Sequence, residues 1–249
     1  MTEGRYDRHR FFLKDTIRRQ IDFRGTAQSR GLPPPPLQKP CPKEAERTAL
    51  PGPDSLRELA QLDIVDAIAR RQSVRNYSRK PLSVPELALL LWSTQGIRQV
   101  LSPACALRTV PSAGARHALE TYLAVANVRS LEAGLYRYLP VEHELALLEA
   151  DPQVNIKAAA AALGQGFVAN AAVTFFWTTI PERMEWRYDL AAHKVIAVDA
   201  GHVCQNLYLA CEAVGAGTCA IAAYDQTLCD QLLGVDGEDL RNRQMLHSA

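Results

Sequence analysis

The order of helix-like and strand-like segments after about residue 56 most constrains the fold of this 249-residue chain. Some segments carry apolar residues at helical spacing, and others are short apolar runs bounded by turn residues. The two kinds mix without the strict alternation of a doubly wound sheet, which favours an α+β protein. Helices are expected at 56–71, 84–95, 155–164, 198–215 and 225–234, and strands at 121–128, 134–140, 143–150, 171–180 and 218–223.

The composition argues against several classes of protein. Apolar residues make up 47% of the chain, charged residues 22%, and the formal net charge of +1 does not suit a protein that coats nucleic acid or an anionic membrane. No apolar run approaches the roughly 20 residues of a membrane-spanning helix, and the first residues lack the apolar core of a signal peptide. We therefore expect a cytoplasmic globular protein that binds neither nucleic acid nor membrane.

The six cysteines predict no metal site. None forms a Cys-x-x-Cys pair, and four lie in apolar surroundings, so reduced and packed thiols are expected.

The first fifty residues differ in composition from the rest of the chain. A basic helix-like stretch at 10–20 is followed by the proline tract "GLPPPPLQKPCPK". Such a tract is extended, and it is either a ligand for a proline-binding partner or a strap across the domain surface. We divide the chain into a basic, proline-rich arm at 1–55 and a domain at 56–249.

Common catalytic motifs are absent from the sequence. There is no G-x-S-x-G, no Walker A loop, no H-E-x-x-H and no G-x-G-x-x-G between a strand and a helix. Ser112 and His117 lie close in sequence, but no nucleophile elbow frames the serine. These absences disfavour hydrolases and nucleotide-binding enzymes of the common kinds.

The stretch "RRQSVRNYS" at 70–78 concentrates positive charge in a nearly neutral chain. Arg71, Ser73 and Arg75 alternate along an extended segment, so their side chains share one face. Two guanidiniums and a hydroxyl suit a phosphate dianion. A solvated, salt-bridged helix end is the alternative.

Two stretches of small residues could approach a flat ligand closely. One is the Pro-Ser-Ala-Gly turn at 111–114, and the other is "GAGTCAIAAYD" at 215–225. Small side chains leave backbone N–H and C=O groups open to a planar ring. The alternative for the first stretch is a turn that merely precedes a helix.

In this order and spacing, the motifs resemble the FMN-dependent nitroreductase superfamily over about residues 30–240, and most of all its SagB-type dehydrogenase branch. The resembling stretches are "PPPPLQKP", "RRQSVRNYSRKPLSVPELALLLWSTQGIR", "RTVPSAGARHALETYLAV", "GLYRYLPVEHELALL" and "AGHVCQNLYLACEAVGAGTCAIAAYD". The resemblance implies a nitroreductase-like fold, with helices around a mostly antiparallel sheet, in a homodimer of the domain-swapped type.

The resemblance also implies site residues. Arg71, Ser73 and Arg75 would hold the FMN phosphate and ribityl chain. Against the flavin ring would lie Pro111, Ser112 and Ala113 from the other subunit, Gln165 at the pyrimidine edge, and Ala222 and Ala223 near N5.

The chemistry implied by the resemblance belongs to the flavin. Hydride would pass between NAD(P)H, or another donor, and a small organic substrate in ping-pong fashion, so no catalytic acid–base pair is identified.

The C-terminal tail departs from the family pattern. It has little strand character, and Arg241 or Arg243 would have to replace a late basic residue near the phosphate. The Lys-Tyr pair of azoline oxidases is not placed either, because Arg187 precedes Tyr188 and Lys194 stands apart. Two alternatives to the small-molecule oxidoreductase stay open. One is an azoline-type dehydrogenase that acts on a modified peptide with partner proteins, and the other is a flavin-binding protein without turnover.

Overall fold

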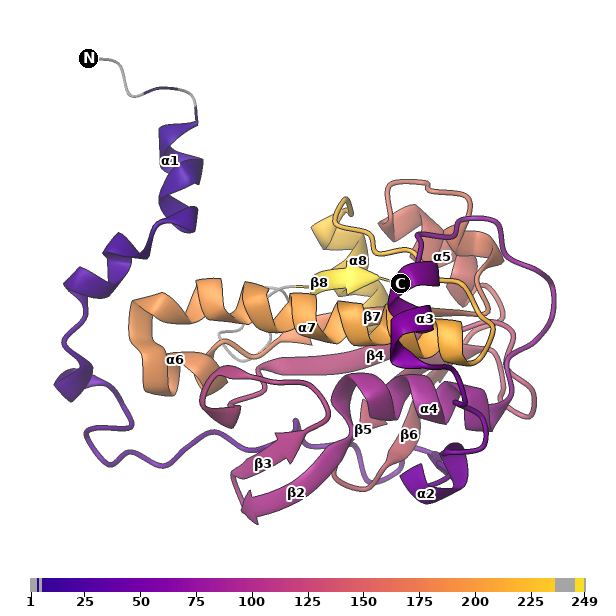
Figure 1. Cartoon of the computed structure of the whole chain (residues 1–249), viewed down its shortest axis with the longest axis horizontal. Coiled ribbons are helices and arrows are strands. Elements are labelled where there is room, and N and C mark those ends of the chain that lie inside the picture. Colours follow the sequence, from indigo (N-terminus) through magenta and orange to yellow (C-terminus); the bar gives the residue numbers. More distant parts are fainter. Residues whose placement is uncertain (1–3, 5, 236–244, 249) are drawn as a thin grey trace.

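The computed structural model describes residues 4, 6–235 and 245–248, and its centre is a six-stranded sheet (Figure 1). The strands pair antiparallel in the order β1-β6-β5-β4-β7-β8. This sheet, with its helices, confirms the predicted α+β class. The strands are β1 (Arg47–Ala49), β4 (Leu119–Val125), β5 (Gly134–Leu139), β6 (Glu144–Ala150), β7 (Val173–Thr179) and β8 (Met245–Ser248).

Alternating side chains of the sheet form a core on each face. On one face, Leu123 and Trp177 pack with the long helices α4 and α7, and on the other, Tyr122 and Phe176 pack with α5 and α8. Helices therefore cover both faces of the sheet. The helices of the domain are α2 (Pro53–Leu56), α3 (Ile64–Arg70), α4 (Val84–Gln95), α5 (Val154–Ala161), α6 (Glu182–Tyr188), α7 (Ala192–Ala213) and α8 (Gln226–Leu233).

Local signals set the ends of the two long helices. At the start of α4, Glu86 N donates to Ser83 Oγ, and Ser83 N donates to Glu86 Oε2, which completes a capping box. Beyond the end of α7, Gly215 has a φ of +67°, a conformation that glycine adopts without strain. Both ends agree with the sequence-based expectation.

The helix expected at 56–71 forms only as α3 at Ile64–Arg70; α2 ends at Leu56 and residues 57–63 are not helical, so the prediction is wrong for the first half of the range. Asp63 accepts a hydrogen bond from the backbone N–H of Val65 at 2.8 Å and so begins α3 as a separate helix. The apolar spacing runs on through the non-helical residues 57–63 into α3 and hides the break.

The strand pattern also differs from the expectation in two places. Residues 218–223 form no regular strand: Thr218 and Ile221 each lie in an isolated bridge, and that of Thr218 is to Ser73. A separate hairpin, β2 (Ile97–Ser102) and β3 (Cys105–Arg108), was not predicted, since its two strands are irregular in register and largely lack an apolar alternation.

The prediction that the C-terminal tail has little strand character is wrong. Residues of β8 pair antiparallel with β7, at Phe176 with Ser248 and at Thr178 with Met245. Backbone pairing along a free strand edge does not depend on an apolar alternation in the sequence. Arg241 and Arg243 lie outside the described residues.

The proline tract lies as a strap on the domain, while the residues before it, which include α1 (Asp7–Arg10), extend past α6 (Figure 1). Arg137 donates to the carbonyls of Lys39 and Pro40 at 3.0 and 2.9 Å, and Arg108 donates to Leu37 O at 2.9 Å. The 3-10 turns of this arm are Phe11–Leu13, Asp15–Gln20 and Phe23–Gly25. Strand β1 lies within the predicted arm at 1–55 but pairs in the central sheet of the domain. The domain boundary at residue 55 therefore stays a prediction.

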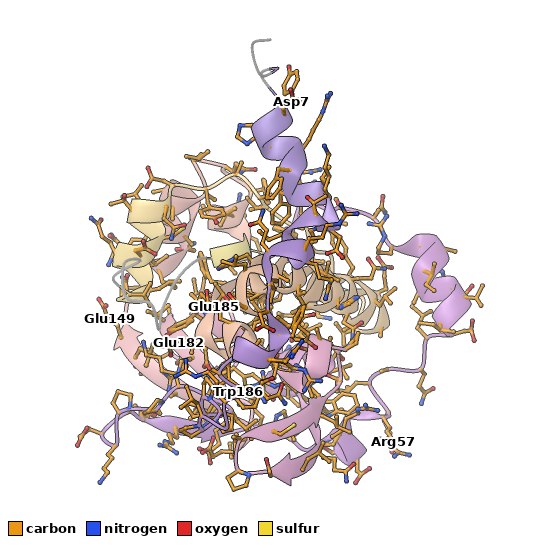
Figure 2. All side chains as sticks on the ribbon, turned by 90° about the vertical axis from the view of Figure 1, so that its left-hand side faces the viewer. Asp7, Arg57, Glu149, Glu182, Glu185 and Trp186 are labelled. Atoms are coloured by element: carbon orange, nitrogen blue, oxygen red, sulfur yellow. The ribbon has the colours of Figure 1, made fainter. Side chains whose placement is uncertain are left out.

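Figure 2 faces the end of the molecule from which the arm extends, and it labels Trp186, Glu182 and Glu185 of α6 there. The indole nitrogen of Trp186 donates to Leu32 O at 2.9 Å. The arm is therefore joined to α6 as well as to the sheet.

Candidate functional site

The segment 71–75 leaves α3 in an extended conformation and runs beside residues 217–218. Val74 N donates to Thr218 O at 2.9 Å, and Ser73 forms a parallel bridge with Thr218. A Cβ at Gly217 would lie 2.7 to 2.9 Å from the side chain of Val74, so only glycine permits this approach. The inward side chain of Val74 leaves those of its neighbours, Ser73 and Arg75, free to face outward.

The positive charge of this segment is not neutralised by described carboxylates. Arg70 pairs with Asp66 at 3.0 Å, whereas Arg71 and Arg75 form no ion pair with any residue that the structure describes. The alternative of a salt-bridged helix end therefore explains the charge of Arg70 only. The guanidiniums of Arg71 and Arg75, on either side of Ser73 in the sequence, are left without such a partner. Such an arrangement can bind an anion through charge-assisted hydrogen bonds.

Tyr208 on α7 holds this segment in place. The backbone N–H of Ala220 donates to the Tyr208 hydroxyl at 2.8 Å, and that hydroxyl lies 2.9 Å from Ser73 Oγ. The Arg71 guanidinium lies over the Tyr208 ring at 5.1 Å. Because its oxygen accepts from Ala220, the phenol can donate its proton to Ser73, which leaves the serine proton for a ligand.

A second group of contacts joins this segment to the other predicted residues. The Arg75 guanidinium lies 5.9 Å from the centre of the Phe167 ring, two residues after Gln165. Gln165 Nε2 donates to Ala223 O at 3.3 Å. These contacts bring together five of the nine predicted residues, Arg71, Ser73, Arg75, Gln165 and Ala223, and Ala222 is the sequence neighbour of Ala223.

The other three predicted residues lie near a different part of α7 from Tyr208. They are Pro111, Ser112 and Ala113. Pro111 and Ser112 line a small cavity together with Asp199 of α7, and interactions with Ser112 and Ala113 lower the pKa of Asp199 against the larger effect of burial. Asp199 precedes Tyr208 by nine residues, about 14 Å along the helix axis. Within one chain, the turn at 111–113 is therefore separated from the phosphate-binding candidates.

The turn at 111–114 is packed against the end of α6. Gly114 has a φ of +58°, and a Cβ there would lie 2.8 to 2.9 Å from atoms of Arg187 and Tyr188. The side chain of Lys194 donates instead to Lys14 O. The pair that stands next to this turn is thus Arg187 and Tyr188.

The groups around Ser112 do not form a nucleophile and base. Ser112 Oγ accepts from the backbone N–H of His117 at 2.9 Å. Burial, with repulsion from Arg108, lowers the pKa of His117 to about 3, and burial raises the pKa of Asp199. His117 is therefore neutral, and its backbone rather than its imidazole contacts the serine, which agrees with the absence of a nucleophile elbow around Ser112.

The buried, neutral His117 predicts a loss of stability in acid. The unfolded chain binds a proton near the ordinary histidine pKa of about 6.5, whereas the folded chain does not until far lower pH. Stability therefore falls as pH falls, by about 1 kcal/mol between about pH 7 and about pH 5.5 for this residue. The raised pKa of Asp199 acts in the opposite direction.

Urea unfolding of the wild type and of His117→Asn at the two pH values checks this prediction. Asparagine tolerates the positive φ of 45° at this position. The variant should lose about 1 kcal/mol less than the wild type on acidification. Equal losses in the two proteins would contradict the assignment to His117.

The described part of the chain shows neither a candidate metal site nor a membrane-spanning helix. Among its residues, no group of three or more His, Cys, Asp and Glu side chains could hold a metal ion. The six cysteines are free, and three of them, Cys211, Cys219 and Cys229, are buried. No helix formed by the described residues is long and apolar enough to cross a bilayer.

Sequence reasoning missed Tyr208 and Phe167. Tyr208 follows Leu207, a member of the apolar stripe of the long helix, so its spacing indicated packing alone. Phe167 stands in the same "LGQGFVANAA" stretch as Gln165, and its ring contact with Arg75 depends on the fold.

Comparisons with known proteins agree with this geometry. A model of the "Nitroreductase family" matches residues 68–246. The nitroreductase-type protein MJ1384 of Methanocaldococcus jannaschii is 32% identical over 169 residues, which cover 68% of this chain and 83% of MJ1384. The trifolitoxin-processing protein TfxB of Rhizobium leguminosarum bv. trifolii is 28% identical over 134 residues, 52% of this chain and 36% of TfxB.

A solved structure shares the fold. The crystal structure of a nitroreductase-type protein from Ralstonia eutropha has a TM-score of 0.64 at 25% identity, and the match covers 87% of this chain and 96% of that chain. The family resemblance and the nitroreductase-like fold expected from the sequence are confirmed.

Proposed function

Since the chain belongs to the nitroreductase family, we propose that it is an FMN-dependent oxidoreductase. One observation carries the proposal: two guanidiniums without a described carboxylate partner flank a serine hydroxyl that Tyr208 orients. Arg71, Ser73 and Arg75 bind the FMN phosphate in this proposal. Charge-assisted contacts of this kind favour a phosphate dianion.

The remaining residues of the proposed site hold the flavin ring. The exposed Ala222 and Ala223 leave their backbone open to N5 of a planar ring, and the Gln165 side chain next to them offers polar atoms to its pyrimidine edge. The flavin would supply the hydride chemistry, with NAD(P)H as donor and a small organic molecule as acceptor. The protein binds, orients and polarises the ring.

We propose a homodimer that completes this site. On α3, next to the phosphate-binding segment, Ile64, Val65 and Ile68 are 57, 69 and 58% exposed, an apolar face that a second subunit would cover. Pro111, Ser112 and Ala113 of the partner subunit would then lie against the flavin ring. The separation of this turn from Tyr208 within one chain supports the proposal.

The visible absorption spectrum of the purified protein tests the proposed function. Oxidised-flavin bands, with FMN released on denaturation at about one per chain, support it. Oxidation of NADH or NADPH with a quinone acceptor then tests turnover. A protein that neither carries nor takes up FMN would refute the proposal, and bound FMN without any turnover would favour the flavin-binding alternative.

Removing the Tyr208 hydroxyl is expected to weaken FMN binding. In Tyr208→Phe, Ser73 loses the partner that orients its hydroxyl, and the N–H of Ala220 loses its acceptor. The Kd for FMN should rise about three- to tenfold, the effect of one neutral hydrogen bond. Fluorescence titration of the flavin-free protein measures this Kd. Tyr77→Phe, which removes the hydroxyl of a nearby tyrosine, is the control, and an equal effect of both variants would contradict the role of Tyr208.

Charge on α3 is expected to separate the subunits. Ile68→Asp places a carboxylate on the proposed interface, so dimer affinity should fall about tenfold and FMN should be lost with it. Ile156→Asp on α5 is the matched control, because Ile156 is 57% exposed but lies away from the proposed interface. Sedimentation velocity with absorbance at flavin and protein wavelengths measures both quantities. A monomer loaded with flavin would contradict the shared site.

A second candidate function is oxidation of a modified peptide. The similarity to TfxB, a trifolitoxin-processing protein, favours it, although the chain spans only 36% of TfxB. An azoline ring loses two electrons and two protons as it becomes an azole, and the flavin would take up the electrons. Anaerobic bleaching of bound FMN by an azoline-bearing peptide tests this function. Bleaching by NAD(P)H alone would favour the small-molecule oxidoreductase.

A further inference from the structure

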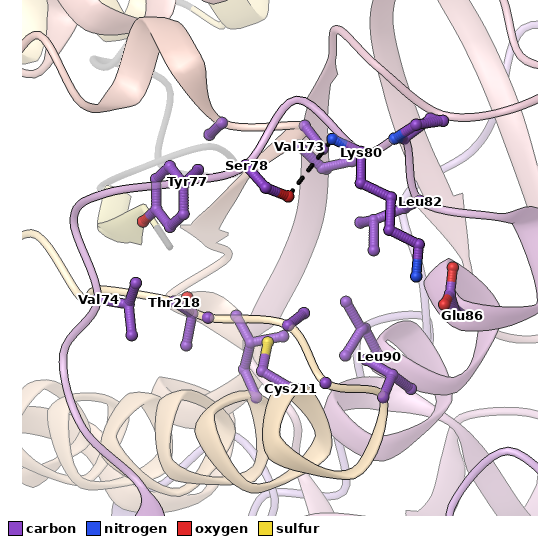
Figure 3. Close-up of a pocket in the computed structure, with 18 of the residues that line it drawn as sticks. Val74, Tyr77, Ser78, Lys80, Leu82, Glu86, Leu90, Val173, Cys211 and Thr218 are labelled. Carbon is purple, nitrogen blue, oxygen red and sulfur yellow. Dashed lines mark hydrogen bonds between the residues drawn. The ribbon is translucent and has the colours of Figure 1, made fainter.

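A hollow lies behind the phosphate-binding segment, on the side away from Arg71, Ser73 and Arg75. Figure 3 shows it between the segment that carries Val74 and Tyr77, helix α4 with Leu90, and helix α7 with Cys211. Its volume is about 290 Å³, close to the lower end of the range for small-molecule sites. None of the residues proposed to hold FMN lines it.

The wall of the hollow is largely apolar, and many of its residues are small. Protein interiors are close-packed, and voids larger than a water molecule are few. In this hollow, small side chains on part of the wall leave a volume open that larger side chains would fill. Small and apolar residues of the wall include Val74, Ala171, Val173, Cys211, Val214, Ala216 and Gly217.

Cys211 contributes an uncharged thiol to this wall. Burial raises the pKa of Cys211 to about 12, so its sulfur behaves as a small hydrophobe. In Figure 3 the sulfur points from α7 into the hollow, opposite Leu90. The inner part of the hollow therefore suits an apolar chain or ring.

The charged side chains at the rim are Lys80 and Glu86. Glu86 is engaged in its capping box, where Oε2 accepts from Ser83 N at 2.6 Å and from Ser83 Oγ at 2.8 Å. Lys80 forms no ion pair within the part of the chain that the structure describes. The rim thus offers a free ammonium to an anionic group, while the neighbouring carboxylate would repel a molecule with several negative charges.

We propose that this hollow binds a small amphipathic monocarboxylate. Its apolar chain lies among Leu90, Val173 and Cys211, and its carboxylate binds Lys80. The site is separate from the FMN site but shares a wall with it, because Val74 lines the hollow while Ser73 and Arg75, its neighbours, face the proposed phosphate site. The ligand would hold this segment in place, so we also propose that the two ligands strengthen each other's binding.

Calorimetric titration of the flavin-free full chain with octanoate tests the cavity site without relying on the proposed function. We expect saturable binding that weakens about three- to tenfold in Lys80→Gln, as for an exposed charge pair, and not in the adjacent control Arg79→Gln. Octyltrimethylammonium should bind more weakly than octanoate. No saturable binding, equal binding of the cation, or an equal loss in the two charge variants would overturn the proposal.

Filling the hollow provides a second test. Cys211→Phe and Val214→Phe should each abolish octanoate binding, and circular dichroism identifies a variant that remains folded. Undiminished binding to either folded variant would place octanoate elsewhere and refute the site. Titration of FMN with and without octanoate tests the coupling, and an FMN affinity that octanoate leaves unchanged would refute that part alone.

Discussion

Glu120→Ala is expected to lower the free energy of unfolding by about 3–5 kcal/mol, the cost of leaving a buried charge without its partner. Glu120 Oε1 accepts from Arg183 Nη2 at 2.5 Å, and both side chains are at most 3% exposed. The same oxygen accepts from the backbone N–H of Lys39 at 2.9 Å. Truncation would therefore strand a guanidinium and release one anchor of the proline strap.

The surroundings of Glu120 increase the cost of its removal. Arg108 and Arg137, which also donate to the strap, are each 3% exposed, so three guanidiniums share this buried region. Burial and repulsion from Arg183 lower the pKa of Arg108 to about 10. Loss of the carboxylate would leave this positive charge less compensated than before.

Urea unfolding measures the effect, with Glu185→Ala as the matched control. Glu185 pairs with His193 at 2.9 Å on the surface, where an ion pair contributes about 1 kcal/mol or less. Glu120→Gln, which keeps an acceptor for Lys39, should lose less than Glu120→Ala. Similar losses for Glu120→Ala and Glu185→Ala would show that the buried pair contributes no more than a surface pair.

Patterns that act within one element predicted most of the fold. The capping box at Ser83 and Glu86, the hairpin of β5 and β6, and the glycine after α7 are local in sequence, and the structure has all three. The pairing of β8 with β7 depends on a free strand edge, which no pattern in the tail reveals. The break before α3 was hidden because the apolar spacing continues through it.

The candidate site likewise combines features that are local in sequence with contacts between distant segments. The outward face of 71–75 follows from strand alternation, which is why Arg71, Ser73 and Arg75 could be chosen from the sequence. The contact between Ser73 and Tyr208 joins residues 135 positions apart and depends on how α7 crosses the segment. Sequence order also cannot show that Ser112 lies near Asp199, nine residues before Tyr208 on α7. This separation of Ser112 from Tyr208 is what motivates the proposed second subunit.

Arg75→Ala is expected to raise the Kd for FMN about ten- to 150-fold, because a hydrogen bond to a charged group contributes on the order of 1.5–3 kcal/mol. The fold should lose less than about 1 kcal/mol, since Arg75 is exposed and its described contact is with the Phe167 ring. Flavin affinity would thus fall far more than stability does.

Arg70→Ala is the matched control for this experiment. It removes the same charge from the same stretch, but Arg70 pairs with Asp66 on α3 and is not one of the outward-facing residues of 71–75. Fluorescence titration with FMN and urea unfolding on both variants separate binding from stability. Full flavin occupancy in Arg75→Ala, or an equal loss of affinity in Arg70→Ala, would mean that the phosphate is held elsewhere or only by the general positive potential of the segment.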